Sequence, residues 1–209
     1  MTLEANHLGF YHNKDRWLFK DVQLSLEPGQ ILGIFGQSGC GKTSLSKVLA
    51  GFGQPQLGQV LVDGQPLPHK GFRPVQLIQQ HPEKTMNPLW TMQKSLTEAY
   101  KPSQDLLLAF GIQEKWLTRR PSELSGGELQ RFSIVRALHP KTKYLIADEM
   151  TTMLDSITQA QVWQSLLHIV KDRQLGLVII SHDFTMLEKL CDTCYLIEEN
   201  RMIPFNQAK

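Results

Sequence analysis

The chain contains the stretch Gly36-Gln37-Ser38-Gly39-Cys40-Gly41-Lys42-Thr43, which fits the phosphate-binding-loop pattern G-x-x-x-x-G-K-[ST]. A short apolar run, Ile31 to Phe35, precedes it, and Ser44 opens a segment of helical character. The glycines allow consecutive backbone N–H groups to turn around an anion, and the helix that follows directs its positive end at the same anion. We therefore expect a nucleoside triphosphate here, with the Lys42 amine on the β- and γ-phosphates and the Thr43 hydroxyl on Mg²⁺.

Two adjacent carboxylates follow a run that reads as a buried strand. Tyr144 to Ala147 is apolar, and Asp148 and Glu149 come directly after it. Because open α/β sheets bind ligands at the carboxyl ends of their strands, we expect this pair beside the phosphate-binding loop. Asp148 suits Mg²⁺ coordination, directly or through water, and Glu149 suits the polarisation of an attacking water as general base. A strand end that carries two solvated acids is the alternative.

A second candidate anion site lies in Leu124-Ser125-Gly126-Gly127-Glu128-Leu129-Gln130-Arg131. Ser125 can cap the helix that begins there, and its spacing to Glu128 predicts a capping box. Gly126 and Gly127 expose backbone N–H groups at the positive end of that helix. Two interpretations are compatible with each other: a plain capped helix, or a site that completes the nucleotide pocket of another subunit.

At this point the motifs resemble one family. Residues 124–131 are similar to the signature sequence of ATP-binding cassette (ABC) transporters, and the resemblance to their ATP-binding subunit covers nearly the whole chain. The segment Met150 to Asp155 resembles the D-loop of the family, in which Asp155 would reach across a dimer interface. Ser181-His182-Asp183 resembles the switch segment, with His182 on the γ-phosphate. A histidine that packs in the core is the alternative there.

Two further residues are assigned through this resemblance. Gln80 resembles the Q-loop glutamine, which senses Mg²⁺ and water and contacts the membrane partner; Gln79 takes this place if the register shifts by one. Tyr11 resembles the aromatic residue that stacks on adenine, and Phe10 is the alternative. A lone aromatic residue near an N-terminus also packs readily against its neighbours.

The resemblance implies ATP and Mg²⁺ as cofactors, and it implies four groups of site residues. The catalytic residues are Lys42, Glu149 and His182. The ATP-binding residues are Tyr11, Gly36, Ser38, Gly39, Cys40, Gly41, Lys42, Thr43 and Ser44. The Mg²⁺ site contains Thr43, Gln80 and Asp148. The residues that contact the ATP of a partner subunit are Ser125, Gly126, Gly127 and Glu128.

A finer resemblance is to the oligopeptide, dipeptide and nickel uptake branch, which includes metallophore importers. It is carried by Asp148 to Asp155 with the following Gln159-Ala160-Gln161, and by Asn87-Pro88. This branch implies an importer whose other parts are a second ABC ATPase subunit, two transmembrane permease subunits and an extracellular substrate-binding protein. The chain would then lie at the cytoplasmic face of the cell membrane, as a peripheral protein. An exporter cassette and a soluble non-transport ABC ATPase are the alternatives.

The chain departs from the family pattern at a few positions. Met150 stands where the family usually has proline, Cys40 replaces serine or alanine, and Asn200 replaces a glycine in the last turn. None of these changes removes a reacting group, and asparagine tolerates a positive φ. The peptide branch usually carries a longer C-terminal extension than the one that ends here at Lys209, which weakens the assignment of the cargo but not of the ATPase.

Composition excludes several other classes of protein. The hydrophobic content of 41% is that of a globular chain, and the net charge of +2 gives no reason to expect a nucleic-acid partner. No apolar run approaches the roughly 20 residues of a membrane-spanning helix, and the N-terminus lacks the pattern of a signal peptide. Cys191 and Cys194 form a lone C-x-x-C, which we interpret as two small buried hydrophobic residues rather than a metal or redox site.

The expected fold is a single ABC ATPase domain, residues 1–209, of the α/β class. Strands that alternate with helices after the phosphate-binding loop predict a mostly parallel sheet, and the first part of the chain predicts an antiparallel β-subdomain. Short helical pieces that begin after His81-Pro82, with Pro102 and Pro121 as breaks, predict a small helical subdomain over residues 81–123. It would be inserted into a P-loop core formed by residues 1–80 and 124–209.

Overall fold

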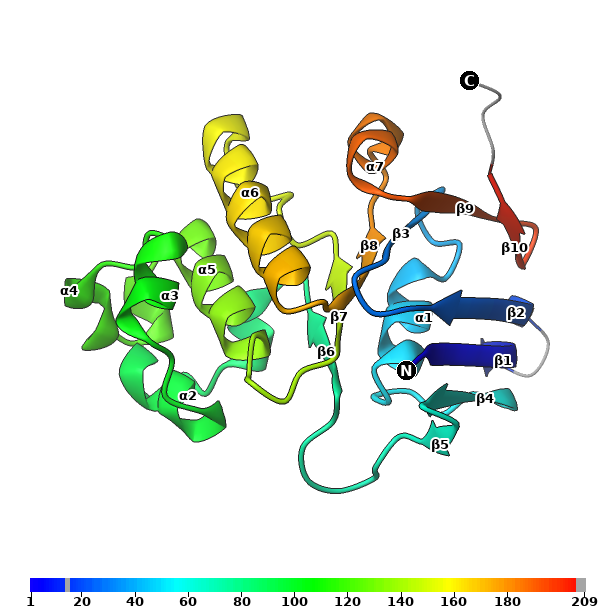
Figure 1. The fold of residues 1–209 in the computed structure, drawn as a ribbon, viewed down its shortest axis with the longest axis horizontal. Helices are drawn as coiled ribbons and strands as arrows, with labels where there is room; N and C mark the ends of the chain where they lie inside the picture. Colours follow the sequence, from blue (N-terminus) through cyan, green and yellow to red (C-terminus); the bar gives the residue numbers. More distant parts are fainter. Residues whose placement is uncertain (14–15, 206–209) are drawn as a thin grey trace.

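The computed structural model of the chain describes residues 1–13 and 16–205, which form two sheets flanked by helices (Figure 1). The larger sheet has the strand order β10-β9-β3-β8-β7-β6. Its strands are β3 (Ile31–Gly36), β6 (Val75–Ile78), β7 (Tyr144–Asp148), β8 (Gly176–Ile180), β9 (Thr193–Glu198) and β10 (Arg201–Pro204). All neighbours in it are parallel except β9 and β10. This is the mostly parallel sheet that the sequence predicts.

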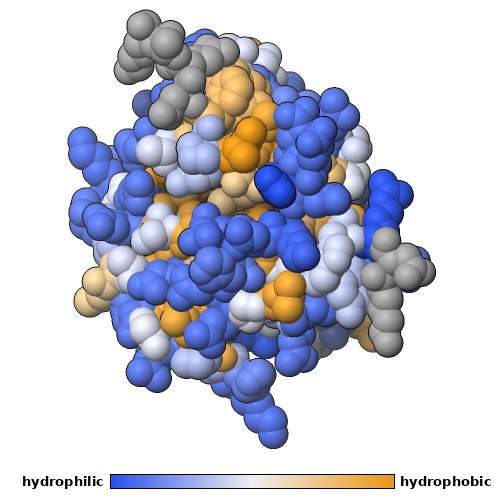
Figure 2. Space-filling model, turned by 90° about the vertical axis from the view of Figure 1, so that its right-hand side faces the viewer, coloured by the Kyte–Doolittle hydropathy of each residue, from blue (hydrophilic) through white to orange (hydrophobic). Residues whose placement is uncertain are grey.

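The smaller sheet is antiparallel and has the order β2-β1-β4-β5. It consists of β1 (Leu3–Asn13), β2 (Arg16–Leu26), β4 (Leu57–Val62) and β5 (Gln65–Pro66). The turn Asp63-Gly64 joins β4 to β5, with positive φ at both residues. The face of the molecule turned toward the viewer in Figure 2 is mostly hydrophilic, with its hydrophobic residues in small groups.

Helices cover both faces of the large sheet. On one face α1 (Lys42–Leu49) lies between the two sheets, and on the other lie α5 (Gly126–Ala137), α6 (Ser156–Asp172) and α7 (Phe184–Leu190) (Figure 1). Alternate residues of β7 and β8 point to opposite faces and join different clusters. Leu145, Ala147, Leu177 and Ile179 pack with α5 and α6, and Tyr144, Ile146, Val178 and Ile180 pack with α1. Both strands are fully buried, as strands covered on two faces should be.

The segment between β6 and α5 is helical. It contains a short 3-10 helix η1 (Pro82–Thr85), α2 (Met92–Ala99), α3 (Gln104–Ala109), α4 (Glu114–Leu117) and a second 3-10 helix η2 (Pro121–Glu123). These are the short helical pieces that the sequence predicts within residues 81–123. Helix α5 packs against both η1 and α2, and it also contacts β6, so it bridges this segment and the large sheet.

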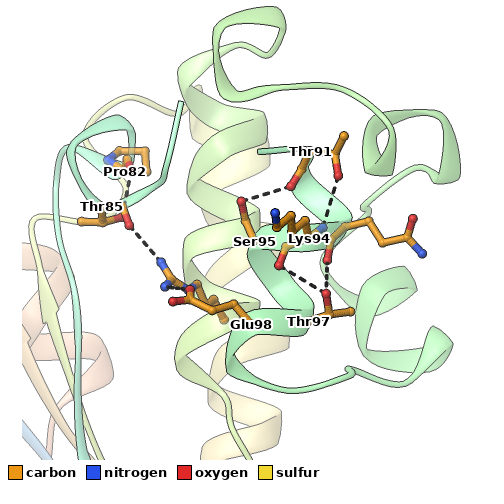
Figure 3. A network of polar contacts seen from close by, with 9 residues as sticks. Pro82, Thr85, Thr91, Lys94, Ser95, Thr97 and Glu98 are labelled. Atoms are coloured by element: carbon orange, nitrogen blue, oxygen red, sulfur yellow. Dashed lines mark hydrogen bonds and ion pairs between the residues drawn. The ribbon is translucent and has the colours of Figure 1, made fainter. Parts of the chain in front are cut away.

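A polar network fastens the helical segment to α5 (Figure 3). The guanidinium of Arg136 on α5 donates to the Thr85 carbonyl, at 2.9 Å, and pairs with the Glu98 carboxylate. The Thr85 hydroxyl in turn donates to the Pro82 carbonyl at 2.8 Å. The 3-10 helix η1 is therefore tied to α5 through Arg136. None of the helices among the described residues has both the length and the apolar character that crossing a bilayer requires.

Candidate functional site

The phosphate-binding loop joins β3 to α1 and closes around an amine. Gly41 has φ 101°, a conformation that a side chain would strain. A Cβ on Gly36 would lie 2.7 Å from the Ile197 carbonyl oxygen, so the backbones of β3 and β9 meet too closely for any other residue. Lys42 is buried, and its Nζ donates to the carbonyls of Gly36 at 2.7 Å and Gln37 at 2.9 Å. The loop thus holds a positive charge at its centre, where an anion is expected.

Asp148 is the last residue of β7, and its carboxylate is almost fully buried, with 3% of the residue exposed. Its Oδ2 accepts a hydrogen bond from the Ser46 hydroxyl of α1 at 2.8 Å, and its Oδ1 is buried with no partner in the described structure. Burial raises the pKa of this carboxyl, while hydrogen bonds from Ser46 and Thr43 and the nearby Lys42 charge oppose the rise. Oδ2 of Asp148 is therefore held by a hydrogen bond, and Oδ1 remains available as an acceptor.

Glu149 lies one residue beyond β7 in the left-handed region, with φ 48°. Its backbone N–H donates to the Ile180 carbonyl at 2.9 Å, and this bond extends the pairing with β8. Glu149 Oε1 lies 3.6 Å from His182 Nδ1, and the imidazole is two-thirds exposed. Both side chains line a cavity of about 240 Å³ together with Thr152 and Ser181. The structure thus brings the two predicted residues together at the carboxyl edge of the sheet.

Gln80 also approaches this edge, through a residue that the sequence did not single out. Its Nε2 donates to the Thr152 hydroxyl at 3.2 Å, and that hydroxyl donates to the Glu149 carbonyl at 3.1 Å. Gln79 instead offers its backbone carbonyl to Gln130 Nε2 of α5, at 3.2 Å. Of the two candidates, Gln80 is the one whose side chain contacts the segment that follows β7.

The two aromatic candidates near the N-terminus differ in their packing. Phe10 stacks on Phe19 of the core at 5.8 Å between ring centroids. Tyr11 is half-buried and meets Trp17 edge to face at 4.9 Å. The next residue, His12, places Nε2 3.4 Å from the Ser44 hydroxyl. The end of β1 therefore lies beside the first turn of α1, and Phe10 is the more fully committed to the core.

The N-terminus of α5 forms the predicted capping box. The Glu128 N–H donates to the Ser125 hydroxyl at 3.2 Å, and the Ser125 N–H donates to Glu128 Oε2 at 2.7 Å. A Cβ built on Gly126 would meet only Met153 Sδ, at 3.4 Å. This helix end is therefore preorganised, and it has open space at Gly126.

Asp155 has a structural role within its own chain. Its Oδ1 accepts from the Thr158 N–H at 2.9 Å and caps α6, which lowers the pKa of its carboxyl.

Cys191 and Cys194 both point at Gly33 of β3, with each Sγ 3.0 Å from where a Cβ of that residue would lie. Burial raises the pKa of both thiols, as expected of packing residues rather than reactive ones.

The sequence model of the family described as "ABC transporter" matches residues 19–152 of this chain. The chain belongs to this family. The nickel import system ATP-binding protein NikE of Staphylococcus aureus (strain bovine RF122 / ET3-1) is 33% identical over 219 residues, which cover 96% of this cassette and 88% of NikE. The NikE of strain MSSA476 is 32% identical with the same coverage. Membership implies ATP binding and ATP hydrolysis, as the sequence predicted.

Solved structures confirm the cassette fold. An ATP-binding subunit of an ABC transporter superposes with a TM-score of 0.83 and 21% identity, covering 99% of this chain and 90% of that one. The dimeric cassette MJ0796, bound to ADP and Pi in a post-hydrolysis state, gives 0.82 and 19%, with 99% of both chains covered. Clostridium perfringens cbiO1, part of the transporter complex cbiONQ, gives 0.78 and 22%, covering 96% of this chain and 86% of its own.

The residues predicted for Mg²⁺ are chemically suited to it. Thr43, Gln80 and Asp148 offer a hydroxyl, an amide and a carboxylate, and Mg²⁺ takes oxygen ligands and retains several waters. Asp148 Oδ1 is a buried acceptor without a partner, and such an atom is costly unless something binds it. The structure therefore leaves an acceptor for a cation beside the phosphate-binding loop.

Proposed function

We propose that this cassette is the ATP-hydrolysing subunit of an ABC importer for nickel, metal-chelate complexes or peptides. It would work at the cytoplasmic face of the cell membrane with two transmembrane permease subunits, a second cassette and an extracellular substrate-binding protein, and without nucleic acid. The likeness to NikE over 96% of the chain supports the importer and its class of cargo. The observation that carries the enzymatic part is the meeting of Glu149 and His182 beside a phosphate-binding loop with an intact lysine.

The roles of the residues follow from their positions. Lys42 exchanges the Gly36 and Gln37 carbonyls for the β- and γ-phosphates, which are stronger acceptors because they are charged. Thr43, Gln80 and Asp148 would hold Mg²⁺, which neutralises charge on the phosphate oxygens when bound. The remaining contacts to ATP come from the loop itself, that is from Gly36, Ser38, Gly39, Cys40, Gly41 and Ser44, and from Tyr11 at the adenine.

Glu149 acts as the general base of this proposal. Its side chain is mostly buried, with 20% exposed, whereas the His182 side chain is 66% exposed. A carboxylate at the wall of the cavity can accept a proton from a water that is in line with the γ-phosphate, and the exposed imidazole can reach the γ-phosphate oxygens. Thr152 joins the Glu149 carbonyl to Gln80, so a change at the Mg²⁺ site would be transmitted to the backbone of the base.

The second half of the pocket comes from another cassette. Ser125 and Glu128 cap the N-terminal end of α5 reciprocally, and the N–H groups of Gly126 and Gly127 remain for an anion brought by a partner. Asp155 caps α6 close to this end, since Met153 and Leu154, which precede it in the D-loop, approach Gly126 and Gly127. Residues 81–123 are fastened by Arg136 to α5, which begins at the signature sequence. They would move with α5 and pass this motion to the permease subunits.

Glu149→Gln tests the enzymatic part of this proposal. We expect ATP affinity to stay within a few-fold, while turnover falls by a factor of about 100 or more, because an amide cannot take the proton of the attacking water. The ATP-bound pair of cassettes should accumulate in its closed state. Glu188→Gln, the same change at an exposed position on α7, is the control. Hydrolysis that continues undiminished in Glu149→Gln would remove this residue from its role.

A further inference from the structure

Ser46 is a polar residue in the interior of the molecule that none of the motifs includes. It lies in the second turn of α1 with none of its surface exposed. Its hydroxyl oxygen is 2.9 Å from the Thr43 carbonyl and 2.8 Å from Asp148 Oδ2. The first contact is a common one for serine within a helix. The second joins α1 to the last residue of β7, which is 102 residues further along the chain.

The number of protons that the Ser46 hydroxyl can donate decides which of the two contacts is its hydrogen bond. A serine hydroxyl has one proton to donate, and both neighbours are acceptors when Asp148 is ionised. A carboxylate is the stronger acceptor, because hydrogen bonds to a charged oxygen are shorter and more stable than those to a neutral carbonyl. The proton of Ser46 therefore belongs to Asp148 Oδ2. This leaves Oδ1 as the oxygen with free acceptor capacity.

We propose that Ser46 is a positioning residue for the Mg²⁺ site: by holding Oδ2, it fixes the plane of the Asp148 carboxylate and presents Oδ1 to the metal ion or its water. The inference rests on the proposed role of Asp148. Without the hydroxyl, Oδ2 loses its 2.8 Å hydrogen bond from Ser46, in a site where 3% of the aspartate is exposed. The carboxylate would be free to rotate and to offer either oxygen. Hydrogen bonds from residues that do not themselves bind the metal orient its ligands and contribute strongly to metal affinity.

The test measures metal dependence without hydrolysis. In the full chain, binding of a fluorescent ATP analogue is titrated with Mg²⁺ from an EDTA-treated start, and Mn²⁺ binding is followed by its paramagnetic resonance. For Ser46→Ala we expect the Mg²⁺ concentration at half-saturation to rise about 10-fold, with the metal-free affinity for the analogue unchanged within 2-fold. Ser46→Thr keeps the hydroxyl and should restore the half-saturation value to within 3-fold of the parent.

Two matched variants separate positioning from packing. Ser95→Ala removes a hydroxyl of the same burial, 2% exposed, that donates only to the Thr91 carbonyl within its own helix (Figure 3). It should leave the Mg²⁺ titration unchanged. Ser46→Cys has a volume close to that of Ser46→Thr but a much weaker donor, so the comparison of these two stands even if Ser46→Ala folds poorly. The cysteine variant should need several-fold more Mg²⁺ than the threonine variant.

The outcomes separate this inference from the proposed function. Asp148→Asn should remove most of the Mg²⁺ dependence; if it does not, the assignment of Asp148 fails, and the inference fails with it. If Asp148→Asn acts as expected while Ser46→Ala matches the parent, Ser46 has no positioning role. Equal titrations for Ser46→Cys and Ser46→Thr would overturn the inference as well. So would a shift in Ser95→Ala as large as that in Ser46→Ala.

Discussion

Asp148 and Glu149 are neighbours in the chain, yet the backbone gives their carboxylates different surroundings. Asp148 is still within β7 and faces α1, while Glu149 has already left the strand. The positive φ of Glu149, 48°, turns its side chain toward His182. A left-handed conformation costs a non-glycine residue roughly 1 kcal/mol, and such strain gathers at functional sites. The strained conformation of Glu149 thus gives the carboxylate proposed to activate water different surroundings from the carboxylate proposed to bind Mg²⁺.

Asn200 shows the same conformation where no chemistry is expected. Together with Glu199 it forms the two-residue turn between β9 and β10, with φ 64° and 46°. Glycine adopts this conformation without strain, whereas alanine pays the full steric penalty that asparagine partly avoids. We expect Asn200→Gly to change the free energy of unfolding by less than about 1 kcal/mol, and Asn200→Ala to lower it by about 1 kcal/mol. Urea denaturation measures both, and equal stability of the two variants would contradict the prediction.

At the scale of elements, the regular parts of the fold could be predicted and the irregular ones could not. The apolar strands before Gly36 and Asp148 are short, continuous and followed by helices, so periodicity and capping residues locate them. By contrast, β1 and β2 contain positive φ at His7 and Asp21 and several register shifts, which interrupt the alternation on which strand prediction depends. The sequence therefore predicts an antiparallel β-subdomain there without defining the bounds of these strands.

The candidate site likewise contains residues that could be predicted from the sequence and residues that could not. The phosphate-binding loop and the signature helix are contiguous in sequence, so spacing alone reveals them. Ser46, Thr152 and Gln130 act through contacts to Asp148, Gln80 and Gln79, which are far from them along the chain. Ser46 lies outside the motifs, and although Gln130 and Thr152 lie within them, the motifs do not name their partners. A single sequence contains no pattern that marks such pairs, because the contact exists only after the sheet has formed.

Tyr100, which is half-buried, and Tyr144, which is buried, give a prediction about the packing of elements. The Tyr100 hydroxyl, at the end of α2, donates to the Val135 carbonyl of α5 at 2.7 Å. The Tyr144 hydroxyl of β7 is buried without a partner in the described structure. Burial raises the pKa of both to about 12, so both are protonated donors at neutral pH. We expect Tyr100→Phe to lower the free energy of unfolding by about 1 kcal/mol and Tyr144→Phe to leave it unchanged or raise it. Urea denaturation of the two variants side by side checks the order, and the reverse order would contradict it.

At the scale of the whole molecule, the parallel sheet gathers the reacting groups at one edge. The ends of β3, β7 and β8 lie next to one another in the sheet, and each is followed directly by site residues: the loop after Gly36, the carboxylates, and Ser181 with His182. The helix end at Ser125 belongs to α5, which packs against the helical segment. The site residues at the carboxyl ends of the strands and the helix end at Ser125 are thus two separate surfaces. Such a molecule is suited to pairing with a second cassette, whose helix end would meet the nucleotide of the first.

Gly126→Glu tests this pairing without disturbing the chain that carries it. The new side chain starts in open space, with Met153 Sδ 3.4 Å from its Cβ. Glutamate is the better helix former, and its charge is favourable at a helix N-terminus, so the variant should be at least as stable as the parent. The same charge should repel the triphosphate of the partner.

In the Glu149→Gln background, with the second cassette present, we expect the variant to bind ATP normally yet fail to form the ATP-dependent pair in size-exclusion chromatography. Gln113→Glu, which adds a charge at the exposed start of α4, is the control and should pair like the parent. Undiminished pairing by Gly126→Glu would show that this helix end does not face the nucleotide of another cassette.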